Sequence, residues 1–149
     1  MFRGQSRHNI DSKGRVSLPA RFRDALLRTN ETGLILTPDP FEPCLHLYPL
    51  AAWEEFERKV SALPSLDRNI IQFRRLYISP AVDVEVDAAG RVRIPPDLRQ
   101  KAQLEKDALW AGMGLKAELW STPLWEAAIA MTDEQRADFR DTVQELIRV

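Results

Sequence analysis

The sequence predicts a β-rich α+β fold made of two pseudo-symmetric repeats with flanking helices. The main observation is an internal repeat: DSKGRVSLPARFR (11–23) returns as DAAGRVRIPPDLR (87–99), 76 residues further along the chain. A weaker match, at an offset of 72, joins LHLYPLAAWEEF (45–56) to AELWSTPLWEAA (117–128). Two copies are too few for a solenoid, so we expect the two halves to share one core.

Each repeat is predicted to open with a hairpin. VDVEVD (82–87) alternates apolar and acidic residues, which is the period of a strand with one buried face. The Asp-x-x-Gly that ends it fits a tight turn, in which the aspartate accepts backbone hydrogen bonds and Gly14 or Gly90 adopts a positive φ. RVSLP and RVRIP then return as strands, and we expect Pro19 and Pro95 where strand gives way to helix.

A second hairpin follows in each repeat, with strands at 34–37 and 45–48 in the first copy and at 108–113 and 116–120 in the second. Apolar residues at helical spacing then predict helices with one buried face. Trp110 and Trp120 could stack on bases, but packing inside the strands is favoured. The residues expected in the core are Phe22, Ala25, Leu26, Leu50, Trp53, Phe56, Val60, Leu63, Leu98, Trp110, Trp120 and Trp125.

The chain therefore divides into a first repeat (5–51), connecting helices (52–79), a second repeat (80–123) and C-terminal helices (124–149). The last helix begins with a capping box, Thr132 to Gln135. Its apolar stripe needs a partner, for which a neighbouring subunit is a candidate; the stripe consists of Phe139, Val143, Leu146 and Ile147.

The composition indicates a cytoplasmic protein. Cys44 is the one cysteine among 149 residues, so no intrachain disulfide can form. The opening residues MFRGQSRHNID contain no apolar segment of the kind found in secretory signals. No apolar run approaches the ~20 residues that span a bilayer, so no membrane association is expected.

The net charge of −1 conceals an uneven distribution. Residues 1–30 carry +5 and residues 65–106 carry +2, whereas 31–64 and 107–149 carry −4 each. The basic segments coincide with the repeated motif, so they could orient the protein on a polyanion. An ordinary solvated surface explains the charges about equally well.

Catalytic and metal-binding motifs are not evident. The sequence contains no glycine-rich phosphate loop, no Gly-x-Ser-x-Gly and no evident Ser/Cys-His-Asp set. Cys44 and His46 lack a third ligand at metal spacing, and His8 is distant. We therefore expect no enzyme activity, no cofactor and no metal site.

Two copies of Asp-x-x-Gly-Arg-aliphatic-x-Leu/Ile-Pro, the opening MFRG and the chain length resemble the MraZ family. These bacterial proteins regulate the division and cell-wall gene cluster and belong to the larger SpoVT/AbrB-like group of swapped-hairpin domains. The resemblance implies a double-hairpin barrel, binding to double-stranded promoter DNA, and assembly into a closed ring larger than a dimer. It also implies repression of that cluster, including the protein's own promoter, and association with the nucleoid.

The resemblance places the DNA contacts on the repeated turns. Arginine can meet phosphate or a guanine edge with two hydrogen bonds, and the turn aspartates would orient it. A solvated Asp–Arg pair is the alternative for either copy taken alone, and contact with bases or with phosphates stays open. Asp97 replaces Arg21 in the second copy, so we expect that copy to contribute less. The candidate residues are Arg15, Arg91, Asp11, Asp87, Lys13, Arg3, Arg7, Arg21 and Arg23.

A second hypothesis is an antitoxin-type interaction protein. It would bind an operator through its hairpins and a partner protein through its C-terminal helix. Its tail should be disordered when free, whereas the capping box and apolar stripe favour a helix packed within the protein's own assembly.

Overall fold

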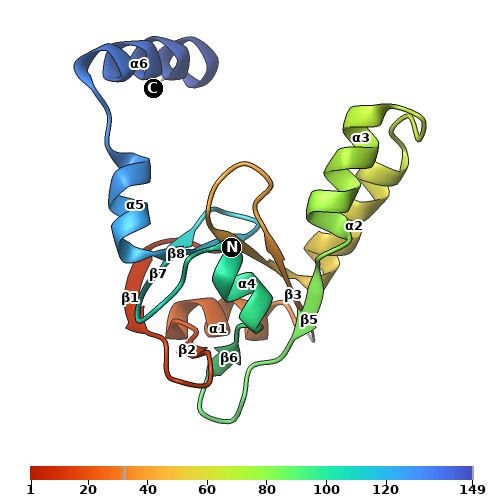
Figure 1. The fold of residues 1–149 in the computed structure, drawn as a ribbon, viewed down its shortest axis with the longest axis vertical. Helices are drawn as coiled ribbons and strands as arrows, with labels where there is room; N and C mark the ends of the chain where they lie inside the picture. Colours follow the sequence, from red (N-terminus) through yellow and green to blue (C-terminus); the bar gives the residue numbers. More distant parts are fainter. Residues whose placement is uncertain (32, 149) are drawn as a thin grey trace.

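The computed structural model describes residues 1–31 and 33–148. The strands of this part of the chain are β1 (Gln5–Asn9), β2 (Arg15–Ser17), β3 (Leu34–Pro38), β4 (Leu45–Pro49), β5 (Val82–Val84), β6 (Arg91–Arg93), β7 (Asp107–Gly112) and β8 (Ala117–Ser121). Six of them form an antiparallel sheet in the order β1-β7-β8-β4-β3-β5, and β2 pairs with β6 (Figure 1). The two sheets do not close into a barrel within the described residues, so the expected barrel is not confirmed.

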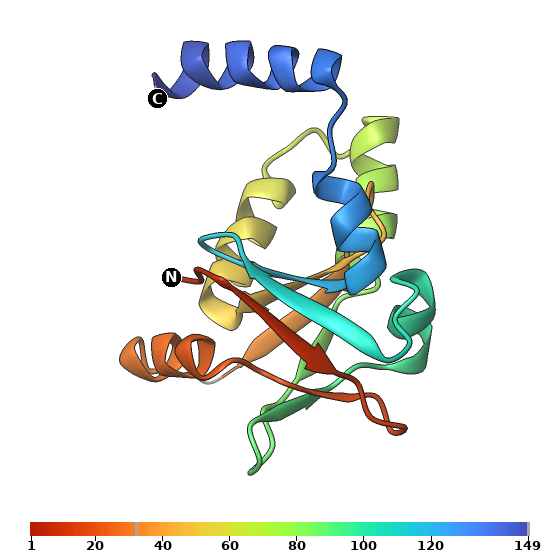
Figure 2. The same cartoon turned by 90° about the vertical axis from the view of Figure 1, so that its left-hand side faces the viewer.

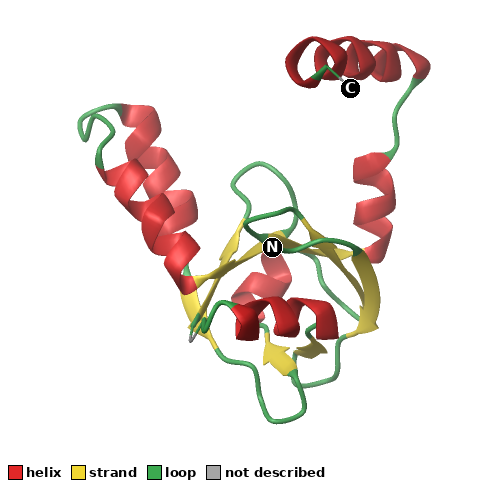
Figure 3. Ribbon diagram, turned by 180° about the vertical axis from the view of Figure 1, so that it is seen from behind, coloured by secondary structure: helices red, strands yellow, loops and turns green. Residues whose placement is uncertain are grey.

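Helices flank the strands, as the sequence predicts. They are α1 (Ala20–Arg28), α2 (Leu50–Ser61), α3 (Arg68–Phe73), the π-helix η1 (Arg74–Ile78), α4 (Pro96–Lys101), α5 (Thr122–Ile129) and α6 (Asp133–Ile147). Pro19 and Pro95 are the residues directly before α1 and α4, which confirms their predicted place. The pair α2 and α3 rises at one end of the molecule, and α5 and α6 rise at the other (Figure 3).

The arms of the opening hairpins pair differently from the sequence prediction. β5 lies beside β3, and β6 pairs with β2 from the other repeat. Exchange between the repeats places Val16 directly opposite Val92, and both side chains are fully buried. The arms therefore contribute to a core shared by the two halves. The second hairpins are confirmed, because β3 pairs with β4 and β7 pairs with β8.

One hydrophobic core combines side chains from both repeats. Phe22 and Leu98, which occupy equivalent positions, are both buried in it. Trp110 is also buried, and its indole N–H donates a hydrogen bond to the backbone oxygen of Ser17 at 2.9 Å. Trp120 is buried as well, so packing inside the strands is confirmed for both tryptophans.

Four of the expected core residues are not fully buried: Leu50, Phe56 and Trp125 are half-buried, and Leu63 is exposed. Trp125 is half-buried and rests against the ring of Trp120, with centroids 5.9 Å apart, because α5 touches the sheet with one side only. Leu63 is 43% exposed, since α2 ends at Ser61 and the apolar stripe does not continue beyond it. Trp53 of the stripe is buried in a smaller aromatic cluster around Tyr77, and the half-buried Leu50 and Phe56 pack against it. Val60 is also buried.

The last helix, α6, begins with the predicted capping box, in which the side chains of Thr132 and Gln135 bond each other's backbone N–H. It extends away from the sheet (Figure 2). Phe139, Leu146 and Ile147 are 54%, 76% and 66% exposed, so the described chain leaves the apolar stripe open. No helix among the described residues is long and apolar enough to cross a bilayer.

Candidate nucleic-acid interface

The first repeated motif folds into a turn closed by Asp11. The backbone N–H of Gly14 donates to the backbone oxygen of Asp11 at 3.0 Å. Oδ1 of Asp11 accepts the N–H groups of Lys13 and Arg15, each at 2.9 Å. Oδ2 accepts Nε–H of Arg15 at 2.7 Å. One carboxylate therefore fixes both the turn and the guanidinium beside it.

The second copy repeats this arrangement. Oδ1 of Asp87 accepts the N–H groups of Ala89 and Arg91 at 2.9 Å, and Oδ2 accepts Nε–H of Arg91 at 3.2 Å. Among the described residues, the one side-chain hydrogen bond that each of these aspartates accepts comes from Nε of its own arginine. Within the described residues the terminal guanidinium nitrogens donate no hydrogen bond, which leaves them available to a planar anionic partner.

The two turns are tied to each other. The N–H of Leu18 donates to the backbone oxygen of Gly90 at 2.9 Å, and the N–H of Ile94 donates to that of Gly14 at 2.8 Å. The residues directly after β2 and β6 thus form backbone hydrogen bonds with the turn of the other repeat. The two Asp–Arg units are held as one rigid pair at one end of the fold.

The outward face of the β2–β6 ribbon is basic. Arg15 lies opposite Arg93, and Ser17 lies opposite Arg91, while the valines between them point into the core. Nη1 of Arg91 is 3.8 Å from Oδ2 of Asp11, so the two units also touch across the ribbon. Three arginines consequently share one short two-stranded surface.

Arg93 is a functional candidate that the sequence analysis missed. The alternation of RVR already placed Arg93 beside Arg91, but only the pairing of β2 with β6 brings it opposite Arg15. Its counterpart in the first copy is Ser17. The second copy therefore regains a positive charge that the exchange of Arg21 for Asp97 removes, which weakens the case for a smaller contribution from that copy.

Glycine is required in both turns. Gly14 and Gly90 have φ values of 80° and 79°, which confirms the predicted positive φ. A Cβ on Gly14 would lie 2.8 Å from Cζ of Arg99, and one on Gly90 would lie 2.9 Å from Nη1 of Arg23. Nε–H of Arg23 also donates to the backbone oxygen of Leu18 at 3.2 Å. Arg23 thus packs over the opposite turn, in addition to any role on DNA.

The remaining candidates lie further from the paired turns or are engaged elsewhere. Arg7 on β1 forms an ion pair with Glu126 of α5 at 2.8 Å, so its charge is partly balanced. Arg21 lies against the N-terminal segment, next to exposed Arg3. Lys13 is exposed at the tip of the first turn. The structure therefore brings together Asp11, Arg15, Asp87 and Arg91, with Lys13 beside them.

Electrostatics keep both turn aspartates ionised. Hydrogen bonding from the backbone N–H of Arg15, with smaller contributions from its guanidinium and from Lys13, lowers the pKa of Asp11 from 3.8 to about 2. The backbone N–H of Arg91 lowers the pKa of Asp87 in the same way. Both carboxylates are therefore charged at neutral pH and hold their arginines in place.

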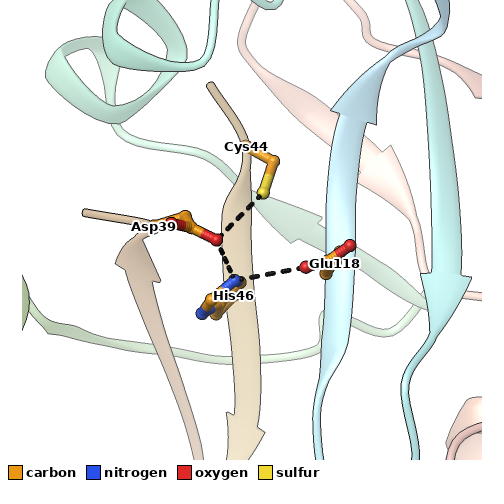
Figure 4. Close-up of side chains that lie close together, drawn as sticks. All are labelled: Asp39, Cys44, His46 and Glu118. Carbon is orange, nitrogen blue, oxygen red and sulfur yellow. Dashed lines mark hydrogen bonds and ion pairs between the residues drawn. The ribbon is translucent and has the colours of Figure 1, made fainter. Parts of the chain in front are cut away.

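A second group of polar side chains lies between β4 and β8, near the opposite end of the strands. Asp39, Cys44, His46 and Glu118 place one potential metal-ligand atom each within 4.8 Å of one another (Figure 4). The sequence offers no third ligand at metal spacing beside Cys44 and His46, but the fold supplies two carboxylates. The signal was present in the weaker repeat, whose alignment matches His46 with Glu118, and these residues are cross-strand neighbours.

The chain is similar to known proteins over nearly its whole length. The family model described as "MraZ protein, putative antitoxin-like" matches residues 1–74 and 77–148. A protein of Azotobacter vinelandii (strain DJ / ATCC BAA-1303) named Transcriptional regulator MraZ is 41% identical, over 99% of each chain. Proteins of the same name from Marinomonas sp. (strain MWYL1) and Pseudomonas fluorescens (strain SBW25) are 41% and 44% identical, over 98% and 87% of this chain and 93% and 86% of their own.

The fold and the comparisons together define a two-repeat protein of the swapped-arm type, similar over its whole length to named transcriptional regulators. The chain belongs to the MraZ family.

Proposed function

We propose that this chain is a sequence-specific DNA-binding transcriptional regulator that represses the division and cell-wall gene cluster, including its own promoter. The observation that carries the proposal is the basic β2–β6 ribbon with its two Asp–Arg turns. The names of its relatives support a role in transcription. It would act in the cytoplasm, on the nucleoid, without catalysis or a cofactor.

The ribbon has the chemistry that DNA recognition needs. A two-stranded ribbon fits the major groove, where a free arginine fork can meet the O6 and N7 atoms of guanine. Arg15, Arg91 and Arg93 present such forks on one rigid face. Lys13, Arg3, Arg21 and Arg7 would add phosphate contacts, which position the protein without specifying sequence.

A single ribbon is a small binding surface, so we propose that several copies act together in a closed ring. Repeated short DNA boxes would then engage several ribbons, and the effective concentration of each further contact would raise the affinity. The open apolar stripe on α6 supports assembly, because exposed Phe139, Leu146 and Ile147 would be covered by a neighbouring copy.

Fluorescence anisotropy of the full chain on its own upstream DNA tests the proposed function. Scrambled DNA of the same length and composition is the control. We expect the upstream DNA to bind roughly 10³-fold or more tightly at physiological salt, with an affinity that falls steeply as salt rises. Equal affinity for both DNAs would contradict the proposed sequence-specific binding.

The second candidate function is antitoxin-type binding of a partner protein through α6. Two observations favour it: the family description contains "antitoxin-like", and α6 leaves its apolar side chains exposed. Hydrogen exchange of the purified protein separates the two candidates. Slow exchange over 133–147 indicates a helix covered in the protein's own assembly, whereas fast exchange indicates a helix that awaits another partner.

A further inference from the structure

A buried polar cluster joins the two repeats, away from the β2–β6 ribbon. His46 on β4 lies directly opposite Glu118 on β8. Cys44 is the residue directly before β4, and its side chain points into the same cluster. Asp39 reaches the cluster from the end of β3 (Figure 4). Residues from three strand ends thus converge on one point.

Burial makes the cluster costly without a cation. Cys44 and His46 are 1% and 4% exposed, and the side chains of Asp39 and Glu118 are only 11% and 13% exposed. Two carboxylates taken out of water beside a thiol need a positive partner. Nε2 of His46 lies 2.9 Å from Oδ2 of Asp39 and 3.4 Å from Oε2 of Glu118, yet it makes no aligned hydrogen bond with either. A proton on Nε2 would therefore lack a well-aligned acceptor, so Nε2 is a buried nitrogen without a hydrogen-bond partner in the described part of the chain.

We propose that Asp39, Cys44, His46 and Glu118 bind a divalent transition-metal ion of the zinc class. Sulfur, nitrogen and two oxygens are a ligand set that zinc accepts, and tetrahedral bonds of 2.0–2.3 Å place ligand atoms about 3.3–3.8 Å apart. The separation of 3.8 Å between Sγ of Cys44 and Oδ2 of Asp39, and the two distances from Nε2 of His46, lie near that range.

Hydrogen bonds from surrounding groups orient the candidate ligands. Nδ1 of His46 lies 2.6 Å from Oη of Tyr77, so it can carry the proton while Nε2 binds metal. Oδ1 of Asp39 accepts the N–H groups of Phe41 and Glu42, which turns Oδ2 toward the centre. Oε1 of Glu118 accepts the indole N–H of Trp120 at 3.0 Å, which leaves Oε2 for the metal.

One side of the cluster borders the protein surface. A surface hollow of ≈ 160 Å³ is lined by Asp39 and Cys44 together with Pro38, Pro40, Glu42, Leu76 and Lys101. With four protein ligands the site is closed, as structural zinc sites are. The ion would tie the β3–β4 loop of the first repeat to β8 of the second, and would stabilise the fold without touching DNA.

Metal titration of the full chain, stripped with a chelator and then freed of it, tests this proposal. We expect one Zn²⁺ per chain and a rise in Tm on zinc addition. Co²⁺ as a probe should give a thiolate-to-cobalt charge-transfer absorption that disappears in Cys44→Ser. His46→Gln should weaken Zn²⁺ binding by more than the roughly 10–100-fold that loss of a supporting residue costs. His8→Gln, in the other histidine, is the matched control and should bind as the wild type does.

Absence of stoichiometric zinc binding by the wild type would overturn the proposal, as would equal binding by His46→Gln and His8→Gln. If His46→Gln does not fold, Glu118→Gln and the cobalt spectrum of the wild type decide instead. A cobalt complex without the thiolate band contradicts the ligand set. DNA binding is read separately, so failure here leaves the proposed function untouched.

Discussion

At the level of single residues, Asp11 divides its two oxygen atoms between the backbone and a side chain. Oδ1 closes the turn by accepting two N–H groups, and Oδ2 aligns the guanidinium of Arg15. A carboxylate near DNA would repel phosphate, but this one is largely satisfied within the protein. Its effect is to present the terminal nitrogens of Arg15 in one orientation, which reduces the conformational entropy lost on binding.

Asp11→Asn tests that role through pH. The asparagine keeps an oxygen for the backbone but cannot form the charged bond to Arg15. The folded-state pKa of Asp11 is lowered from 3.8 to about 2. The stabilisation is therefore fully present above pH 3.8 and is lost as the pH falls through about 2.

We expect the wild type to melt at a higher temperature than Asp11→Asn at pH 5 to 7, and the gap in Tm to close between pH ~4 and ~2. Thermal melts by circular dichroism measure this. A gap that stays constant down to pH 2 would show that the charge of Asp11 contributes nothing to the turn.

Arg93 offers a second residue-scale prediction. It lies opposite Arg15 on the basic face, so Arg93→Ala should weaken specific DNA binding by about 1–3 kcal/mol if it meets a base edge. If it meets a phosphate, the slope of log K against log salt should shrink by about one unit instead. Anisotropy titrations at several salt concentrations distinguish these. Unchanged affinity and slope would exclude Arg93 from the interface.

At the scale of single residues, the sequence predicted the features that depend on neighbouring residues in the chain. The positive φ of Gly14 and Gly90 and the helix starts after Pro19 and Pro95 follow from neighbouring residues alone. The position of Arg93 opposite Arg15 does not follow from neighbouring residues, because it depends on which strand pairs with β6.

At the level of elements, the alternation of apolar and polar residues predicted strands but not their partners. The short arm β2 could pair with its own hairpin neighbour or with the equivalent arm β6, and both choices satisfy the same alternation. Burial of Val16 against Val92 in the shared core accompanies the exchange. The buried polar cluster of Asp39, Cys44, His46 and Glu118 could not be predicted for the same reason, since it depends on the pairing of β4 with β8 from the other repeat.

The two turn glycines should differ in their tolerance of a side chain. Gly14→Ala would bring its Cβ within 2.9 Å of the backbone oxygen of Ile94, a residue whose own N–H is bonded to the backbone oxygen of Gly14. For Gly90→Ala the three atoms nearest to the new Cβ all belong to the guanidinium of Arg23, a side chain and not backbone. Both variants incur a backbone strain of ~1–2 kcal/mol for the positive φ, so the loss of unfolding free energy should be larger for Gly14→Ala.

Gly114→Ala is the control for backbone strain alone, because Gly114 has a φ of 90° and a Cβ added there would have no atom within 4 Å. Urea denaturation of the three variants gives the comparison. The expected order of destabilisation is Gly14→Ala, then Gly90→Ala, then Gly114→Ala. An equal effect at Gly14 and Gly114 would argue against the close packing of the two turns.

At the level of the whole molecule, the exposed apolar stripe of α6 indicates a surface that a binding partner would cover. The sequence predicted the helix and its capping box, and both are present. What covers Phe139, Leu146 and Ile147 cannot be predicted from one chain, because a stripe specifies burial and not the identity of the partner.

We expect the full chain to form an assembly larger than a dimer at micromolar concentration, and a chain ending at residue 130 to form smaller species. The reason is that removal of 131–149 deletes the open stripe. Size-exclusion chromatography with light scattering measures both. A monodisperse monomer of the full chain would contradict the proposed ring.

The proposed function depends on contact between the paired turns and DNA, and Arg15→Ala probes that contact. The Arg15 side chain is 33% exposed and more enclosed than a free surface arginine, so a modest loss of stability, about 1 kcal/mol, is expected from its bond to Asp11. Binding should suffer more, because a bidentate base contact is worth roughly 1–3 kcal/mol and each subunit on the DNA repeats the loss. Arg58→Ala is the control, since Arg58 is an exposed arginine of α2 that is also ion-paired, with Glu55.

The measurement is an anisotropy titration of the wild type, Arg15→Ala and Arg58→Ala on the upstream DNA at several salt concentrations, with light scattering and melts on each protein. We predict that a folded, fully assembled Arg15→Ala binds more than ~10-fold more weakly, the equivalent of 1.4 kcal/mol, while Arg58→Ala binds as the wild type does. Affinity and salt slope equal to the wild type in a folded Arg15→Ala would contradict the account and move any DNA contact away from the repeated turns.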